Sequence, residues 1–98
     1  MIHNALGEMY RAAGQLDRAL PHYREAIHFY ELAGDLYGAA RTRYNVALSF
    51  LSAGRLADAR DYADAALRNY QTYGTSAQQD IQKTLDLIAD IDKASHPH

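Results

Sequence analysis

Hydrophobic residues recur at intervals of three and four along most of the chain, which is the spacing of one face of an α-helix. The pattern falls into five segments, which we expect to be helices over about residues 2–13, 16–33, 36–53, 56–73 and 75–94. Asp35 is a suitable N-cap for the third helix, and Thr75 or Ser76 for the fifth. No segment alternates as a β-strand does, so the pattern predicts an all-α fold.

Glycines separate the predicted helices at a constant interval. Gly14, Gly34, Gly54 and Gly74 lie 20 residues apart, and the first three stand in the recurring phrase Ala-Gly-x-Leu. Because glycine readily adopts the left-handed conformation that ends a helix, each one is expected to mark a turn between antiparallel helices. Pro21 is expected near the first turn of the second helix, with a mild kink.

The chain also repeats itself at an offset of 40 residues. Residues of matching size recur in the pairs Leu6/Val46, Gly7/Ala47, Tyr10/Phe50, Leu16/Leu56, Ala19/Ala59, Ala26/Ala66 and Tyr30/Tyr70. Small residues let paired helices approach closely, and large residues fill the space between pairs. The repeat therefore predicts a stack of antiparallel helix pairs, an architecture that usually binds rather than catalyses.

This motif resembles the tetratricopeptide repeat. The family's pattern is a Leu-Gly pair, an aromatic residue, a turn glycine, an alanine, a second aromatic residue and a second alanine. The first copy supplies Leu6, Gly7, Tyr10, Gly14, Ala19, Tyr23 and Ala26, and the second supplies Val46, Ala47, Phe50, Gly54, Ala59 and Ala66. The 40-residue period is similar to that of repeats in kinesin light chains, cell-polarity adaptors and bacterial nucleotide-switch regulators.

The resemblance implies a right-handed α-solenoid of about two and a half units. We expect one domain over residues 1–94, with units at about 1–33, 34–73 and 75–94, and a disordered tail at 95–98. Solenoids generally need about three repeats and polar caps, so exposed apolar ends are expected. The abrupt start of the first helix predicts a chain cut from a longer array.

In this family the first helix of each repeat lines a concave groove that binds a peptide. Carried over by position, the groove residues are Asn4, Glu8, Arg11, Arg41, Tyr44, Asn45, Leu48 and Ser52. The Asn45 amide is suited to a peptide backbone, and Arg41 to a carboxylate. The alternatives are that Asn45 bonds a neighbouring helix or water, that Arg41 is a solvated charge, and that Tyr44 packs against the next helix.

A second function, from a different class, is a structural, self-associating segment of a larger signalling or transcriptional regulator. In that case the ends of the solenoid make the contacts. The residues expected there are Ile2 and Met9 at one end and Ile81, Leu85 and Ile88 at the other.

Composition narrows the choice of chemistry. The 98 residues carry a formal charge of −2 and no cysteine, which argues against nucleic-acid binding, disulfides and Cys-based zinc sites. No apolar run is long enough for a membrane span. His22 and His28 lack a one-face metal spacing, and no catalytic grouping is recognisable. We expect a cytoplasmic protein that is not an enzyme, has no cofactor or metal, and binds a protein or peptide.

Overall fold

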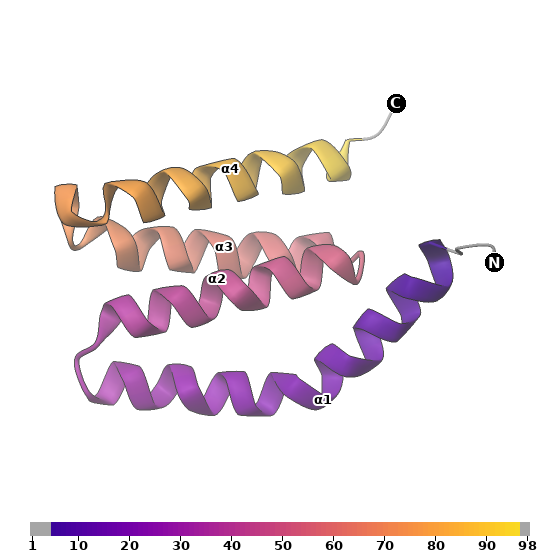
Figure 1. The fold of residues 1–98 in the computed structure, drawn as a ribbon, viewed down its shortest axis with the longest axis horizontal. Coiled ribbons are helices and arrows are strands. Elements are labelled where there is room, and N and C mark those ends of the chain that lie inside the picture. Colours follow the sequence, from indigo (N-terminus) through magenta and orange to yellow (C-terminus); the bar gives the residue numbers. More distant parts are fainter. Residues whose placement is uncertain (1–4, 97–98) are drawn as a thin grey trace.

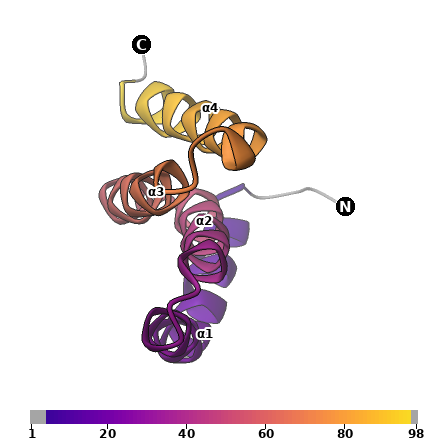
Figure 2. The same cartoon turned by 90° about the vertical axis from the view of Figure 1, so that its left-hand side faces the viewer.

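The computed structural model describes residues 5–96, and the side chains of residues 12–96. The elements are α1 (Ala5–Leu32), α2 (Leu36–Ser52), α3 (Leu56–Gln71), the 3-10 turn η1 (Gly74–Ala77) and α4 (Gln78–Ser95). No strand occurs in that part of the chain, which confirms the all-α fold. Each helix packs antiparallel to the one before it (Figure 1). Seen end-on, α3 lies to one side of α2 and α4, which touch each other (Figure 2).

The core follows from the alternation of small and large residues. Ala47, Ala59 and Ala63 are fully buried, so α2 and α3 approach closely. Phe50 and Ile91 are the largest side chains buried with them. A smaller cluster of Ala40, Ala66, Tyr70 and Ala77 lies apart from this one.

Two of the predicted turns have the same geometry. Gly34 and Gly54 have φ values of 75° and 76°, as expected of helix-ending glycines. The next residue closes each turn: the Asp35 N–H donates to the Tyr30 carbonyl at 2.8 Å, and the Arg55 N–H to the Phe50 carbonyl at 2.9 Å. Asp35 is the N-cap of α2, as predicted, because its Oδ1 accepts a hydrogen bond from the Gly38 N–H at 2.8 Å.

The prediction of a turn at Gly14 is wrong. The first two predicted helices form one continuous helix, α1, so the described residues 5–96 contain four α-helices rather than five. A glycine inside a helix costs only about 1 kcal/mol relative to alanine, and continuing the helix keeps the backbone hydrogen bonds that a turn would break. Pro21 consequently lies inside α1 rather than near a helix start. Figure 1 shows that α1 is bent, as expected of a helix that lacks one backbone donor.

The predicted cap of the last helix is also wrong. Gly74 has φ 61°, as expected, but the residues after it form η1, and α4 begins only at Gln78. Its N-cap is Ala77, which has no side-chain acceptor. The Ser76 hydroxyl instead donates back to the Tyr73 carbonyl at 2.8 Å, so it stabilises η1.

Candidate functional site

Four of the predicted groove residues form one exposed face of α2. Arg41, Asn45, Leu48 and Ser52 follow one another at steps of four, three and four, which places them on a single side of the helix. All four are exposed, and Leu48 retains 40% of its accessible surface. We call these four residues the α2 stripe.

The side chain of Asn45 is exposed on this stripe. Its backbone carbonyl accepts a hydrogen bond from the Ser49 hydroxyl at 3.1 Å. Within residues 12–96 no protein group is hydrogen-bonded to its amide. An amide carries both donors and an acceptor, which is what an extended peptide backbone requires of a side-chain partner.

The charge of Arg41 acts on side chains that are also affected by the Asp80 carboxylate. The Tyr37 hydroxyl donates to Asp80 Oδ2 at 2.6 Å, and this bond raises the pKa of Tyr37. Burial, with a smaller contribution from the Asp80 charge, raises the pKa of Tyr70 to about 12. Arg41 opposes both shifts, so its charge acts on the same two phenols. This end of α2 therefore combines an exposed cation with an acid already hydrogen-bonded to a tyrosine.

Tyr44 is only partly available to a ligand. It is half-buried and packs against both core clusters. Lys83 Nζ, from α4, lies 5.3 Å from the centre of its ring, a cation–π distance. The ring therefore helps to join α2 to α4.

Lys83 is a cation beside Tyr44 that the sequence analysis did not identify. Its counterpart 40 residues earlier, Arg43, gives no indication, because that side chain turns away to Glu31, at 3.0 Å, and Asn69. Leu85, two residues along α4, is about 200° away around the helix, so it lies on a different side from Lys83.

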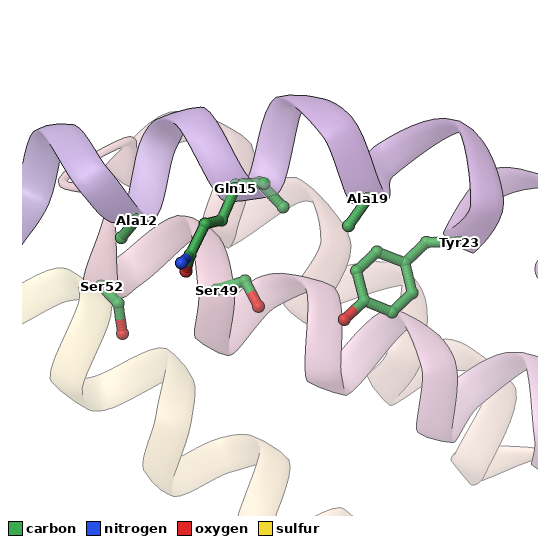
Figure 3. A pocket seen from close by; sticks show the side chains of 7 residues that line it. Ala12, Gln15, Ala19, Tyr23, Ser49 and Ser52 are labelled. Atoms are coloured by element: carbon green, nitrogen blue, oxygen red, sulfur yellow. The ribbon is translucent and has the colours of Figure 1, made fainter.

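A hollow lies where the C-terminal end of the α2 stripe meets α1. It encloses about 290 Å³. Figure 3 shows the side chains that point into it, namely Ala12, Gln15, Ala19 and Tyr23 from α1 and Ser49 and Ser52 from α2. Of the predicted groove residues whose side chains are described, Ser52 alone lines this hollow.

Three predicted groove residues fall where the structure gives no side-chain information. Asn4 lies outside the described residues, and Glu8 and Arg11 belong to the part of α1 whose side chains are not described. The prediction of apolar side chains exposed at the two ends of the helix stack is partly wrong. Ile88 is 9% exposed and belongs to the main core, because its side of α4 packs on α3. Leu85, at 43%, is exposed as expected, while Ile2 and Met9 lie outside the described side chains.

The described residues offer little for metal or membrane chemistry. No group of three histidine or carboxylate side chains there could hold a metal ion. None of the helices in the described part of the chain has the length and apolar character of a membrane span.

Comparison with known proteins agrees with the repeat pattern. A family model described as tetratricopeptide repeat matches residues 1–72 of the 98. The match covers α1, α2 and α3 and ends just after α3. Searches of the curated proteins and of the solved structures gave no match.

Proposed function

The chain belongs to the tetratricopeptide repeat family, whose repeats generally mediate protein–protein interactions, and on this premise we propose that it binds an extended peptide along the α2 stripe. The single observation that carries the proposal is the exposed row of Arg41, Asn45, Leu48 and Ser52, which backs onto a buried core. One rigid helix thus presents a cation, an amide, an apolar side chain and a hydroxyl. These groups can bind the side chains and the backbone of a short peptide.

The spacing along the stripe specifies the chemistry of the ligand. Arg41 and Leu48 are seven residues apart, which is about 10 Å along a helix. An extended peptide covers that distance in about three residues. The preferred ligand has a carboxylate beside Arg41, an apolar side chain beside Leu48, and a free backbone amide between them for Asn45. Lys83 adds a second positive charge on the Tyr44 side.

Peptide selection tests this proposal directly. We would select binders from a random peptide library on the immobilised chain and measure their affinities by fluorescence anisotropy. The test variant is Arg41→Glu with Asn45→Ala, which changes the charge and the amide of the stripe. Its matched control is Arg68→Glu with Gln71→Ala, which makes the same kinds of change at exposed positions of α3.

The proposal predicts acidic, apolar-containing peptides whose affinity falls about tenfold or more in the stripe variant. A hydrogen bond to a charged group contributes roughly 1.5–3 kcal/mol and a neutral one about 0.5–1.5 kcal/mol, and about 1.4 kcal/mol is a tenfold change in affinity. The α3 control should bind normally. Peptides that bind the stripe variant as tightly as the wild type would show that the ligand uses another surface.

Self-association is a second candidate function. Apolar side chains are exposed at opposite sides of the stack, with Phe29 on α1 at 67% and Leu85 on α4 at 43%. Leu32, three residues after Phe29 on α1, is 75% exposed, and neighbouring exposed apolar side chains of this kind are typical of contact surfaces. A sedimentation series tests it: mass that rises with concentration supports this function, and a constant monomer mass contradicts it.

A further inference from the structure

The hollow between α1 and α2 is polar at its edge and apolar at its base. Gln15 and Ser52 are exposed and form the edge. Leu16, which is 3% exposed and belongs to the main core cluster, forms the base. The other four lining residues are half-buried, and none of the seven is charged. Such a hollow suits an uncharged side chain whose apolar end is buried, because a charge there would lose its water without gaining a partner.

The polar groups around the hollow are suited to hold a peptide backbone. The Ser49 hydroxyl donates its hydrogen to the Asn45 carbonyl, so it presents an acceptor to the hollow. Gln15 supplies an amide with two donors and an acceptor, as Asn45 does on the α2 stripe. Figure 3 shows the Gln15 amide on one side of Ser49 and the Tyr23 ring on the other. The edge can therefore bond the backbone on either side of an inserted side chain.

The hollow is large enough for a phenyl ring. It encloses about 290 Å³, whereas a cavity of about 150 Å³ is enough to hold benzene. The chain buries such a ring on the equivalent row of the second repeat. Phe50 is 2% exposed and shares a core cluster with Ala59 and Ala63, whose counterparts 40 residues earlier are Ala19 and Tyr23. Since Ala19 and Tyr23 are only half-buried, the row on α1 still has surface for a ring.

The hollow continues the α2 stripe, because Ser52 belongs to both. Ser52 lies four residues after Leu48, which is about 6 Å along the helix. An extended peptide covers that distance in about two residues, and side chains two residues apart point to the same side. A peptide with an apolar side chain beside Leu48 thus brings its next side chain on that side to the hollow.

We propose that the hollow binds a phenylalanine side chain of the peptide that lies along the α2 stripe, while Gln15 and Ser52 bond the backbone beside it. This inference rests on the proposed function and specifies its ligand further. The peptide carries an acidic residue, an apolar residue three positions away, and a phenylalanine two positions beyond that. The order of these groups follows from the stripe, and the peptide direction is open, so both directions are tested.

Four capped, fluorescently labelled peptides serve as probes. Two have the sequences Asp-Ala-Ser-Leu-Ser-Phe and Phe-Ser-Leu-Ser-Ala-Asp, and the other two have alanine in place of phenylalanine. Fluorescence anisotropy measures their affinities for the wild-type chain. In the direction that binds, the phenylalanine peptide should bind roughly tenfold or more tightly than its alanine version, because a phenyl side chain leaves water.

A matched pair of substitutions on α1 tests the position of the ring. Ala19→Leu fills the hollow with a larger side chain and should reduce the phenylalanine peptide to the affinity of the alanine peptide. Ala26→Leu is the control, since Ala26 is also half-buried but lines a different hollow two turns further along the helix. Both alanines lie outside the core clusters and leucine favours a helix, so circular dichroism should show unchanged helix content.

A second measurement needs no variant. In NMR spectra of the wild-type chain, the methyl resonances of Leu16 and Ala19 should shift with the phenylalanine peptide and much less with the alanine peptide, because an aromatic ring shifts the resonances of protons on its face. Methyl shifts that are the same for both peptides would place the ring elsewhere and overturn the inference, even if a variant failed to fold.

The outcomes separate the hollow from the stripe. A preference for phenylalanine that is lost in Ala19→Leu and kept in Ala26→Leu supports the inference. Equal affinities of the phenylalanine and alanine peptides, with both weakened by Arg41→Glu and Asn45→Ala, overturn the inference and leave peptide binding along the stripe intact. If none of the four peptides binds, the inference and the spacing on which it rests are both overturned, and the library selection decides whether the stripe binds another sequence.

Discussion

The first turn of α2 lies directly against the ring of Tyr30 because residue 38 is a glycine. A Cβ on Gly38 would stand 2.6 Å from Tyr30 Cδ1 and 2.9 Å from the Asp35 carboxylate. Gly38 is also buried, and its N–H is the donor to the Asp35 cap. Because Gly38 has no side chain, the Tyr30 ring and the Asp35 carboxylate can both approach the first turn of α2. This close contact holds the C-terminal half of α1 against α2.

Gly38→Ala should lower the free energy of unfolding by about 1–3 kcal/mol, because the added methyl group must displace the Tyr30 ring or the cap. Urea denaturation followed by circular dichroism measures the change. The control is Gly14→Ala, where the Cβ meets open space, compared at a concentration at which both variants are monomeric. Equal stability of Gly38→Ala and the wild type would show that the contact with Tyr30 is not restrictive.

Asp35→Ala should cost about 1 kcal/mol of stability, the usual value of a side-chain N-cap. The Gly38 N–H then loses the acceptor that it now has at 2.8 Å. Gln15→Ala is the matched control, since Gln15 stands in the same phrase but inside a continuous helix, where alanine is favourable. If both changes had the same effect on the unfolding midpoint, the cap would have no special role.

The three Ala-Gly-x-Leu segments, at Gly14, Gly34 and Gly54, show what the sequence can and cannot predict. The periodic pattern correctly identifies the all-α fold, the turns at Gly34 and Gly54 and the Asp35 cap. It does not distinguish the turn at Gly14 from a continuous helix, because the same Ala-Gly-x-Leu phrase is compatible with both. The difference arises from tertiary packing: around Gly54, Phe50 and Ala59 are buried together in one core cluster.

Part of the candidate site was also predictable from the sequence. The resemblance to the tetratricopeptide repeat implied Arg41, Asn45, Leu48 and Ser52 as groove residues, and their helical spacing puts them on one side of α2, where all four are exposed. It did not identify Lys83, whose approach to Tyr44 depends on how α4 rests on α2 and α3. The 3-10 turn η1, which contacts both α3 and α4, was not predicted by the pattern either.

Ala66→Leu should destabilise the chain by about 1–3 kcal/mol, because the position is fully buried and has no room for added atoms. Ala26→Leu, at the equivalent position of α1, should change the stability of the dilute monomer by less than about 0.5 kcal/mol, since that position is only half-buried. Chemical denaturation of both variants measures the difference. Equal losses would mean that position 26 is packed as tightly as position 66.

Ionisation of the Tyr70 phenol should lower the free energy of unfolding at strongly alkaline pH. Its pKa is about 12 in the folded chain against 10.0 for the free side chain, because burial disfavours the phenolate. The neutral phenol is thus favoured by folding, and this contribution is complete below pH 10 and is lost as the pH rises towards 12. Tyr70→Phe cannot ionise, so its melting temperature should decline less than that of the wild type over this interval. Parallel declines would contradict the assignment to Tyr70.

The most direct test of the recognition surface is a chemical-shift map. A selected acidic peptide would be titrated into the isotope-labelled chain, and the backbone amide shifts would be followed by two-dimensional NMR. Binding along the α2 stripe predicts the largest shifts at Arg41, Asn45, Leu48 and Ser52, with little change at Arg68 and Gln71 of α3. Shifts concentrated on α3, with the α2 stripe unperturbed, would contradict the proposed function.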